Sequence, residues 1–362
     1  MNTELDSRIQ QALRDATPPL PKEPLPIIVV GSGGIVHDAH LPAYRKAGFP
    51  VAALVDARRD RAVELAKEFS IPFATDSLDE AIRHSPGNSI FDVAVPAGAL
   101  LDVLSRLPDG AAALIQKPMG NTLEEAEEIL SVCRKKGLIA AVNFQLRYAP
   151  TMLAAKKISD MGLLGQLHDI EIVVSVYMPW ALWTFLATAP RLEILYHSVH
   201  YIDLVRSWFG NPEKVLARTV RNPSTPNLAA TKSVILLDYG DWKRVYIATN
   251  HNHNFQDTQR SYVQWEGTEG ALHAVMGVNI DYPRGRPDTL SFAKSGEKWQ
   301  TLPTQGNWFP DAFIGSMGSL QAYVTGASDT LPTSVEDAID TMRTVEAAYI
   351  SSQQSGVPLT RD

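Results

Sequence analysis

The chain has little cysteine, no excess of positive charge and no long hydrophobic run. Its single cysteine, Cys133, excludes an intrachain disulfide, so the fold does not require an oxidising compartment. With 33 Lys and Arg against 40 Asp and Glu, the net charge of −7 argues against binding to nucleic acid or an anionic membrane surface. Charged residues or proline interrupt every stretch that approaches the roughly 18 apolar residues of a membrane span. Residues 1–22 also lack the apolar run of a signal peptide. These absences predict a cytoplasmic protein whose partners are small molecules and other subunits.

The remaining composition is that of a globular chain of two domains. Of the 362 residues, 45% are apolar, and at roughly 150 residues per domain this is enough for two buried cores. Residues 1–26 read as an extension, with a short helix over 4–14 and then five prolines before position 27. The folded part is expected to begin at Ile27.

From Ile27 onward, short β-branched runs alternate with helical patterns, which is typical of a parallel sheet with helical crossovers. The pattern predicts a doubly wound α/β domain over 27–148. Its expected strands are 27–30, 51–55, 90–95, 112–115 and 138–142, and its expected helices are 38–47, 59–69, 98–107 and 122–136.

Helix starts carry a capping pattern, in which a Ser or Thr precedes a Glu by three residues. Ser77 stands before Glu80, Thr122 before Glu125, and Thr333 before Glu336. Because the hydroxyl accepts a hydrogen bond from the third backbone N–H of the helix, each pair predicts a helix start.

After about residue 150, strand-like segments follow one another with few helices. Several alternate apolar and polar residues, which predicts an antiparallel sheet with one face covered and the other freer. We therefore expect an α+β domain over 149–362, whose C-terminal helix could instead pack on the first domain. The expected strands are 166–177, 214–221, 232–239, 244–250, 261–266 and 271–275, and the expected helices are 193–209, 310–325 and 334–352.

A glycine-rich turn follows the first strand of the chain. The run Gly31-Ser32-Gly33-Gly34-Ile35 opens a helix, where free backbone N–H groups and the helix dipole suit a pyrophosphate. Val36 takes the place of the third glycine of the dinucleotide fingerprint, which should hold the helix further from the strand. The alternative is a plain glycine turn without a ligand.

Asp56 ends the second strand, 56 − 31 = 25 residues after the first glycine. An acidic residue about 20 residues into such a unit binds the adenosine ribose of NAD and repels the 2′-phosphate of NADP. Arg58 and Arg59 follow, however, and a guanidinium group can bind that phosphate. NAD is the expected cofactor, with NADP possible.

Six motifs in order resemble the glucose-fructose oxidoreductase / inositol dehydrogenase / MocA (Gfo/Idh/MocA) family. The resemblance implies a Rossmann domain followed by a domain with an open, mostly antiparallel sheet. It further implies oxidation or reduction of sugars or cyclic polyols with a nicotinamide cofactor, in homodimers or homotetramers formed through that sheet. The motifs are Gly31 to Ile35, Val95-Pro96, Gln116-Lys117-Pro118-Met119, Asn143 to Pro150, His200-Tyr201-Ile202-Asp203, and Thr333 to Asp337.

Lys117 matches the lysine of the family's Glu-Lys-Pro motif, which lies beside the nicotinamide and assists catalysis. A lysine in a dry pocket beside cationic nicotinamide is driven toward its neutral form, in which it accepts a proton. Gln116 replaces the usual glutamate. Loss of that carboxylate should favour neutral Lys117 still further. The alternative is a surface lysine before a proline turn.

His200 matches the family's catalytic histidine, which takes the hydroxyl proton as hydride leaves the same carbon. The family's aspartate four residues earlier is replaced by Tyr196. On a helix, residues four apart share a face, so Tyr196 could still assist. His197 and Asp203 are further polar candidates for substrate binding. The alternatives are a packing histidine or a metal site with His197 and Asp203, which the three-residue spacing suggests. No metal-binding motif supports that site, and we predict no metal.

The remaining predicted site residues follow from the same resemblance. Val95, Pro96 and Asn143 are expected near the cofactor, together with Lys117. Arg147 either binds substrate oxygens or ties the domains together. Trp180 and Trp183 offer aromatic faces for sugar C–H groups, although core or interface packing is an alternative.

The sequence therefore predicts an NAD(P)-linked dehydrogenase or reductase of a sugar, sugar lactone or cyclic polyol. Two other functions remain open. Some relatives retain NAD and use transient oxidation to cleave a glycosidic bond or to pass hydride between sugars. The second alternative is a sensor that binds nucleotide or sugar without catalysis. It stays open because Gln116 and Tyr196 depart from the family pattern.

Overall fold

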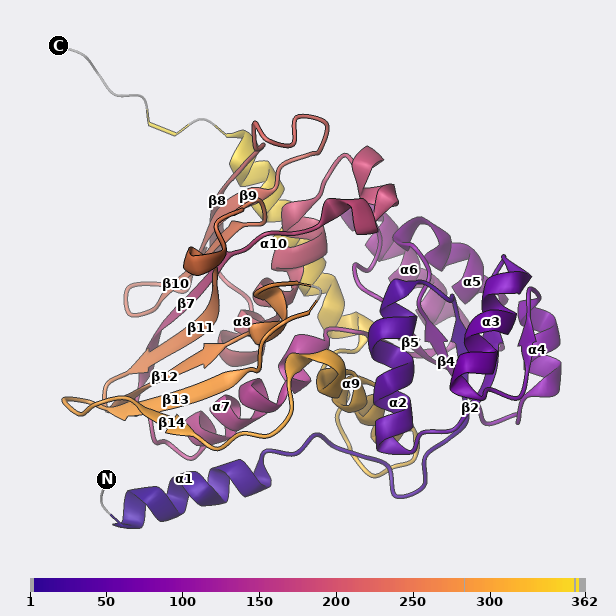
Figure 1. The fold of residues 1–362 in the computed structure, drawn as a ribbon, viewed down its shortest axis with the longest axis horizontal. Helices are drawn as coiled ribbons and strands as arrows, with labels where there is room; N and C mark the ends of the chain where they lie inside the picture. Colours follow the sequence, from indigo (N-terminus) through magenta and orange to yellow (C-terminus); the bar gives the residue numbers. More distant parts are fainter. Residues whose placement is uncertain (1–2, 283, 355, 358–362) are drawn as a thin grey trace. The chain divides into compact units, whose positions relative to one another are not determined.

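A computed structural model describes residues 3–282, 284–354 and 356–357 of the chain (Figure 1). The chain divides into two compact units. The Rossmann unit comprises residues 17–149 and 309–340, and the mixed-sheet unit comprises residues 1–16, 150–308 and 341–362. Each unit has its own sheet.

The sheet of the Rossmann unit has six parallel strands in the order β3-β2-β1-β4-β5-β6. This order reverses direction between β1 and β4, which is the switch point of a doubly wound fold. The predicted parallel sheet is thereby confirmed. Its strands are β1 (Ile27–Val30), β2 (Val51–Val55), β3 (Ala74–Thr75), β4 (Ile90–Val93), β5 (Ala112–Ile115) and β6 (Ile139–Val142).

Helices connect these strands. The first crossover begins as a π-helix, η1 (Val36–His40), and continues as α2 (Leu41–Ala47). The others are α3 (Arg59–Phe69), α4 (Leu78–His84), η2 (Ala97–Ala99), α5 (Leu100–Arg106), α6 (Leu123–Lys136) and η3 (Gln145–Tyr148). Later in the chain come α9 (Trp308–Val324) and α10 (Val335–Gln353).

Two of the three predicted helix caps are present. The Ser77 and Thr122 hydroxyls accept hydrogen bonds from the backbone N–H groups of Glu80 and Glu125. The third prediction was wrong by one residue. The cap of α10 is Ser334, whose Oγ accepts from the Asp337 N–H at 3.3 Å, because the backbone turns one position later than the Thr333 spacing implied.

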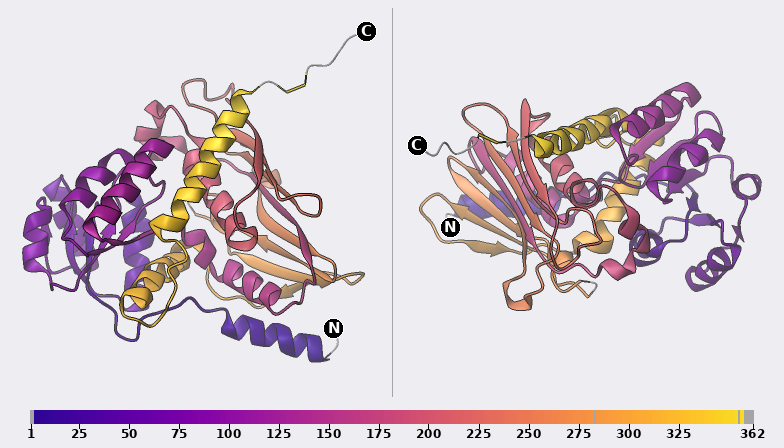
Figure 2. Two further views of the ribbon diagram at one scale, coloured as in Figure 1. Left: turned by 180° about the vertical axis from the view of Figure 1, so that it is seen from behind. Right: turned by 90° about the horizontal axis from the view of Figure 1, so that it is seen from above.

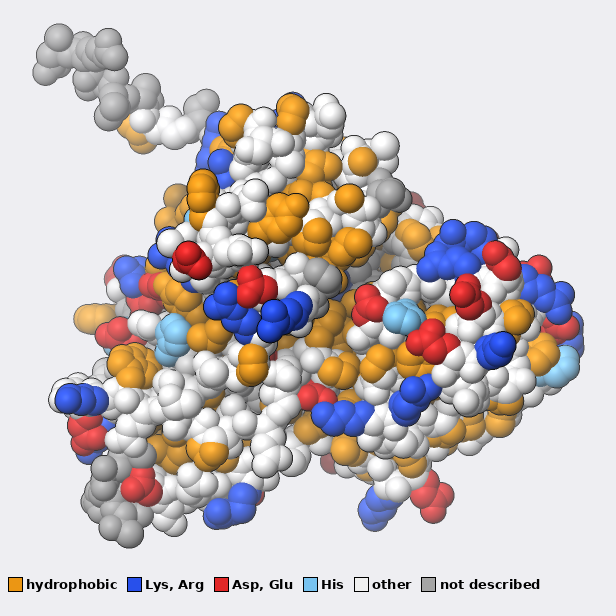
Figure 3. All heavy atoms as spheres, viewed as in Figure 1, with side chains coloured by type: hydrophobic (Ala, Val, Ile, Leu, Met, Phe, Trp, Pro, Cys, Tyr) orange, Lys and Arg blue, Asp and Glu red, His pale blue; other side chains and the backbone are white. Residues whose placement is uncertain are grey.

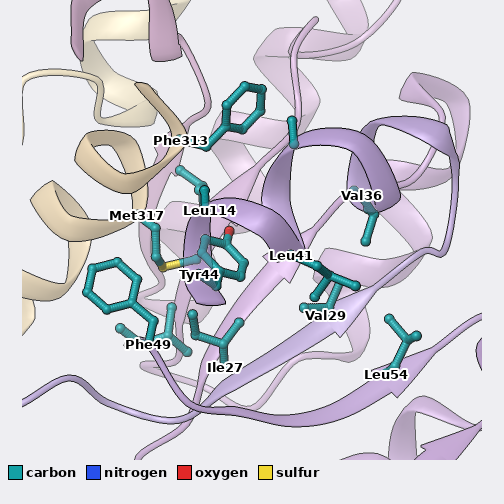
Figure 4. Close-up of a cluster of buried hydrophobic side chains, with 14 of the residues drawn as sticks. Ile27, Val29, Val36, Leu41, Tyr44, Phe49, Leu54, Leu114, Phe313 and Met317 are labelled. Carbon is teal, nitrogen blue, oxygen red and sulfur yellow. The ribbon is translucent and has the colours of Figure 1, made fainter. Parts of the chain in front are cut away.

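The core of the Rossmann unit joins segments that are distant in the sequence (Figure 4). Side chains of β1, α2 and β2 pack with Phe313 and Met317, which both come from α9. Phe313 is 1% exposed. The core around β1 is therefore completed by a helix that lies almost 300 residues later in the chain.

The mixed-sheet unit has eight strands in the order β14-β13-β12-β11-β7-β10-β9-β8. All neighbouring pairs are antiparallel except β7 and β10, which confirms the mostly antiparallel sheet. Sequence analysis missed its last two strands. The strands are β7 (Leu167–Ser175), β8 (Lys214–Val220), β9 (Lys232–Asp238), β10 (Arg244–Asn250), β11 (Arg260–Gly267), β12 (Gly270–Val275), β13 (Thr289–Lys294) and β14 (Gln300–Leu302).

Helices of this unit cover one face of its sheet (Figure 2). They include α7 (Pro150–Asp160), α8 (Val199–Phe209) and α1 (Thr3–Asp15), which packs against α7. On the other face, Leu216, Val234 and Leu236 are exposed. Short helical turns complete the unit: η4 (Trp180–Leu182), η5 (Thr184–Thr188), the π-helix η6 (Ile194–Ser198), η7 (Gln256–Thr258) and η8 (Gly277–Asn279). None of the helices in the described residues has the length and apolar character to cross a membrane.

Phe313→Ala should lower the free energy of unfolding by about 3–5 kcal/mol, because it removes a fully buried ring and leaves a cavity. Tyr323→Ala on the same helix is the control, since Tyr323 is 38% exposed, and should cost less than about 1 kcal/mol. Chemical denaturation measures both. Equal losses would contradict the assignment of Phe313 to the core.

Candidate functional site

The carboxyl ends of five parallel strands meet at one edge of the Rossmann unit. Backbone hydrogen bonds continue past the strands there: Gly31 N–H donates to Val55 O at 2.7 Å, and Gln116 N–H donates to Val93 O at 2.9 Å. Asn143 follows in the same way after β6. Half-buried Val95 and exposed Pro96 follow β4 after one intervening residue, Ala94. The predicted cofactor residues thus lie at one edge, where doubly wound sheets bind ligands.

The glycine turn after β1 has a shape that suits a diphosphate. Gly31 has φ +110°, and a Cβ there would lie 2.4 Å from the Ala94 carbonyl oxygen, so only glycine fits. A Cβ on Gly33 would meet nothing within 4 Å. The helix starts at Gly34, so its first N–H groups, including that of Ile35, have no intrahelical acceptor. Open space beside free amide donors is the arrangement that a phosphate requires.

Asp56 is held in place at the end of β2. Its Oδ2 accepts hydrogen bonds from Ser32 N–H at 2.8 Å and Ser32 Oγ at 2.6 Å, and its Oδ1 accepts from Arg58 N–H. Desolvation opposes ionisation, but these hydrogen bonds outweigh it and lower the pKa of Asp56. The Arg58 guanidinium lies 3.9 Å from Oδ1. The glycine turn and the ribose-binding candidate therefore form one connected structure, carrying a negative charge.

Lys117 follows β5 at the same edge and is half-buried. Desolvation lowers the pKa of Lys117 to about 8. The neighbouring Gln116 is 9% exposed, and its Oε1 accepts a hydrogen bond from Asn143 Nδ2 at 3.0 Å. The lysine can therefore exchange a proton near neutral pH, as a general base or acid must.

Arg147 braces the Rossmann unit. It forms an ion pair with Asp337 at 2.8 Å and donates to the Pro332 carbonyl oxygen at 3.0 Å. These contacts fasten η3 to the segment that leads into α10. Arg147 therefore connects two segments of the Rossmann unit.

In the mixed-sheet unit, the catalytic candidates lie on a helix that changes type. Tyr196 and His197 belong to the π-helix η6, and His200 lies in the first turn of α8. A π-turn has i→i+5 hydrogen bonds, and the joint action of Tyr196 and His200 on a substrate stays a prediction. π-Turns of this kind are frequent at functional sites. His200 is 6% exposed, and Trp308 contacts its ring edge-on, with the ring centroids 5.8 Å apart.

His197 belongs to a buried aromatic and acidic cluster. Its ring lies 4.2 Å from that of His251, and Trp180 contacts both rings edge-on. The Nε2 atom of His251 is 3.4 Å from Oε1 of Glu193, which also accepts a hydrogen bond from Ser198 Oγ. Glu193 and His251 are almost fully buried. Asp203, also fully buried, accepts from Thr341 Oγ1.

Trp180 and Trp183 line a surface hollow of about 400 Å³. Ser224, Thr225 and Asn227 also belong to its lining. The ring of Trp183 packs against Tyr282, with centroids 5.5 Å apart. A lining that combines aromatic and polar side chains suits the apolar and polar sides of a sugar ring.

Sequence reasoning missed a buried polar network behind the carboxyl edge, which joins His40, Tyr44, Asp92 and Asn143. One signal was available. Asp92 stands inside the otherwise apolar strand Ile90–Val93, and a carboxylate there requires buried donors.

Known families match both parts of the chain. Residues 25–144 match the family "Oxidoreductase family, NAD-binding Rossmann fold", and residues 152–273 match the GFO/IDH/MocA C-terminal domain. The chain belongs to the Gfo/Idh/MocA oxidoreductase family. The Rossmann unit is accordingly an NAD(P)-binding domain, and the glycine turn and Asp56 fit that cofactor.

Several known proteins are similar over most of the chain. The oxidoreductase YceM of Salmonella typhimurium is 31% identical, covering 90% of this chain and 97% of that protein. The scyllo-inositol 2-dehydrogenase (NADP(+)) IolW of Bacillus subtilis is 22% identical, covering 89% and 91%. The match to the oxidoreductase YhhX of Escherichia coli spans 64% of that protein. The aldose-aldose oxidoreductase of Caulobacter crescentus shares the fold, with TM-score 0.77, 15% identity, and 91% and 98% coverage.

The surface of the Rossmann unit in Figure 3 carries acidic and basic side chains side by side. On this face, charges of opposite sign are interspersed rather than gathered by sign.

Gln116→Glu should raise the pKa of Lys117 by about one unit, because a nearby carboxylate favours the ammonium form. Acetic anhydride labels only the neutral amine, so the rate of Lys117 acetylation against pH, followed by peptide mass spectrometry, gives this pKa. Gln166→Glu, at an exposed position of the mixed-sheet unit, is the control. An unchanged Lys117 profile in Gln116→Glu would show that the amide does not influence the lysine.

Asp56→Asn should weaken the preference for NAD over NADP by roughly tenfold, because it removes the charge that repels the 2′-phosphate. Titration of both cofactors by calorimetry measures the ratio of dissociation constants. Asp60→Asn, four residues later in α3, is the control. If the ratio of dissociation constants stays constant, Asp56 does not determine the choice of cofactor, and its role is limited to its contacts with Ser32 and Arg58.

Proposed function

We propose that the protein is an NAD(P)-dependent oxidoreductase that transfers hydride between nicotinamide and a carbinol or carbonyl carbon of a sugar, sugar lactone or cyclic polyol. The observation that carries this proposal is Lys117. Its amine, with a pKa lowered to about 8, follows β5 at the same sheet edge as the glycine turn. An NAD(P) domain with a proton-exchanging lysine at its ligand edge supports dehydrogenase chemistry.

The chain's own residues divide the work of cofactor binding. The turn formed by Gly31, Ser32, Gly33, Gly34 and Ile35 would hold the diphosphate, with the first N–H groups of the helix that starts at Gly34 as the donors. Asp56 would accept hydrogen bonds from the adenosine ribose, which favours NAD over NADP, and Arg58 would lie beside the ribose. Val95, Pro96 and Asn143 would adjoin the rest of the cofactor. When bound, the nicotinamide supplies the hydride acceptor or donor.

Three residues would manage the proton. In the oxidative direction, the hydroxyl proton leaves as hydride leaves the same carbon, and in reduction the proton returns to the oxygen. The neutral amine of Lys117 would accept this proton, and its ammonium form would return it. We assign the same task to the imidazole of His200, with the Tyr196 phenol as a hydrogen-bond donor.

The substrate class rests on the hollow of the mixed-sheet unit and on the relatives. Trp180 and Trp183 would stack on sugar C–H faces, and His197, Asp203 and Arg147 are further candidates for binding hydroxyl groups. Two relatives carry the names scyllo-inositol 2-dehydrogenase and D-apiose dehydrogenase. Polyols and sugars are therefore the compounds to test first.

The exposed face of the eight-stranded sheet supports a homo-oligomer. Leu216, Val234 and Leu236 occupy neighbouring positions of β8 and β9, and are 43–54% exposed. A contiguous apolar patch of this kind on a flat sheet marks an interaction surface. We propose that a second copy of this chain covers it, in a dimer or tetramer.

Lys117→Met should lower kcat by at least about 100-fold, because it removes the proton acceptor and keeps a side chain of similar length. The assay follows absorbance of reduced nicotinamide with NAD, then NADP, across aldoses, lactones and cyclic polyols. Lys135→Met, at an exposed position of α6, is the control.

The outcomes of this assay are distinct. Turnover that survives in Lys117→Met would contradict the role of the lysine. If the native chain turns over no substrate with added cofactor but copurifies with bound nucleotide, a retained-NAD enzyme replaces the proposal. If it neither turns over nor binds nucleotide, the oxidoreductase proposal fails.

Leu236→Glu should convert the oligomer to a monomer, because a carboxylate would have to be buried without a partner in the interface. Light scattering coupled to size exclusion gives the mass of each species. Val63→Glu is the control, since Val63 is 49% exposed on α3, in the Rossmann unit. An oligomer that tolerates Leu236→Glu would place the interface elsewhere.

A further inference from the structure

An aspartate buried in the mixed-sheet unit holds the residue that contacts His200. Asp288 is 8% exposed and directly precedes β13. Its Oδ1 accepts a hydrogen bond from the Gly277 N–H at 2.6 Å, and its Oδ2 accepts from the Trp308 N–H at 2.5 Å. The N–H of Asp288 donates to Asn307 Oδ1 at 2.9 Å. One residue thus joins the turn after β12, the start of β13 and the segment that ends at Trp308.

The chemistry of the two donors fixes the direction of these hydrogen bonds. A backbone N–H can only donate, and an ionised carboxylate can only accept, so both oxygens of Asp288 act as acceptors. Hydrogen bonds to an ionised acceptor are stronger than those between neutral groups. An asparagine at this position would accept from one N–H and turn its own NH₂ group toward the other. Of the two side chains, only the carboxylate can hold both segments at once.

The backbone brings Asp288 to these donors through a close approach at Gly277. A Cβ on Gly277 would lie 2.0 Å from the Arg286 carbonyl oxygen, so only glycine fits. The Arg286 N–H donates to the Gly277 carbonyl oxygen at 2.9 Å. These contacts close the connection between β12 and β13 at its base, and Asp288 follows two residues after Arg286. The carboxylate is thus fixed at this base, where it meets the N–H of Trp308.

Trp308 carries this constraint to the imidazole of His200. Its ring contacts that of His200 with the centroids 5.8 Å apart and the ring planes at 86°. Trp308 is 4% exposed and His200 is 6% exposed, so the indole contributes to the burial of the imidazole. Because the Trp308 N–H is bound to Asp288, the backbone from which the indole projects is fixed.

The other hydrogen bond of the carboxylate supports a second contact to the same helix. The turn η8 begins at Gly277, and the side chain of Asn279 in this turn lies 3.4 Å from the hydroxyl group of Tyr201. Tyr201 follows His200 in α8. The Asp288 carboxylate is therefore bound to two segments that each contact α8 at His200 or beside it.

We propose that Asp288 is a positioning residue, which acts through Trp308 to hold the imidazole of His200 in one orientation and shielded from water. A fixed imidazole stays within reach of the hydroxyl whose proton it exchanges. A shielded imidazole exchanges that proton with the substrate rather than with bulk water. The inference rests on the proposed function, which assigns the proton to His200, whereas the contacts of Asp288 do not depend on that assignment.

The test removes the carboxylate and compares the result with the same change elsewhere in the unit. Asp288→Ala leaves the N–H groups of Gly277 and Trp308 without this acceptor. Asp288→Asn retains one acceptor oxygen and is the conservative variant. Asp257→Ala, at an exposed position of η7, is the control.

The readout is the modification of histidines by diethyl pyrocarbonate in the full chain, without substrate or turnover. At about pH 8, above the ordinary histidine pKa of about 6.5, the rate reports the access of the reagent to each ring. Peptide mass spectrometry gives this rate for each histidine. We expect Asp288→Ala to raise the rate at His200 roughly threefold or more, and Asp288→Asn to raise it less, because the indole no longer covers the imidazole. The rate at His251, which is 0% exposed in the same unit, should stay low in every variant.

A double-mutant cycle with Trp308→Ala establishes whether Asp288 acts through the indole. Trp308→Ala removes the ring and keeps the backbone N–H, so it should itself expose His200. The double variant should then raise the rate at His200 no further than Trp308→Ala alone. Additive increases, equal increases in Asp288→Ala and Asp257→Ala, a parallel increase at His251, or no increase in folded Asp288→Ala would each overturn the proposal.

Turnover provides a second distinction. With a sugar or polyol that the protein converts, Asp288→Ala should lower kcat roughly tenfold and leave KM within about twofold, because it disturbs the proton-exchanging group and not the tryptophans of the hollow. A change in KM alone would show that Asp288 shapes the binding surface instead, and would overturn the positioning role.

Hydrogen exchange in the unmodified chain keeps the proposal testable if Asp288→Ala does not fold. The Trp308 amide should exchange at least about 100-fold more slowly than in an unstructured peptide, because its proton is bound to a buried carboxylate. An unprotected Trp308 amide would overturn the proposal, as would a folded Trp308→Ala in which His200 reacts at the native rate.

The modification rates separate this inference from the proposed function. If His200→Gln retains turnover while Asp288→Ala exposes His200, the catalytic role of His200 fails and the link from Asp288 to His200 stands. If turnover depends on His200 but its modification does not respond to Asp288, the link fails and the proposed function stands.

Discussion

The carboxyl edge of the six-stranded sheet depends on the close approach of Gly31 to the carbonyl group of Ala94. The two backbones come so near that a Cβ on Gly31 would lie 2.4 Å from the carbonyl oxygen. This approach turns the chain sharply after β1 and starts a helix at Gly34, with its amide groups directed outward. The Ser32 contacts with Asp56 then fasten the turn to β2.

Behind this edge, the fold buries polar groups that would be costly alone. Asp92 in β4 is tolerated because His40 and Tyr44 both donate to it. Lys117 is half-buried, and the desolvation of its ammonium group lowers its pKa. In the mixed-sheet unit, Glu193 beside His251 shows the same pattern. The cluster around Asp92 includes a residue of the π-helix η1, and the cluster around Glu193 includes residues of the π-helix η6. In both units, π-turns and buried polar side chains therefore occur together.

Two residues, Gln116 and Tyr196, depart from the family pattern. Gln116 cannot carry a charge, and desolvation lowers the pKa of Lys117. The amide oxygen of Gln116 instead accepts from Asn143, and so joins the lysine segment to the core. Tyr196, which replaces the family's aspartate, lies in the π-helix η6, a type of turn that is frequent at functional sites.

The sequence by itself determined five of the six parallel strands, most of the helices, the glycine turn, the positions of Asp56 after β2 and Lys117 after β5, and the family, because these depend on local periodicity and on residues close together in the chain. It did not reveal β3, β13 and β14, whose pairing is defined only by neighbouring strands, or the cap at Ser334. The tertiary structure alone decided that α9 completes the Rossmann core, that two helices begin with π-turns, and that His40, Asp92, Asn143 and Gln116 form one network. The contacts of that network join residues up to 103 positions apart, and the contacts of α9 reach further still. No local pattern encodes them, because they depend on how strands and helices pack in three dimensions.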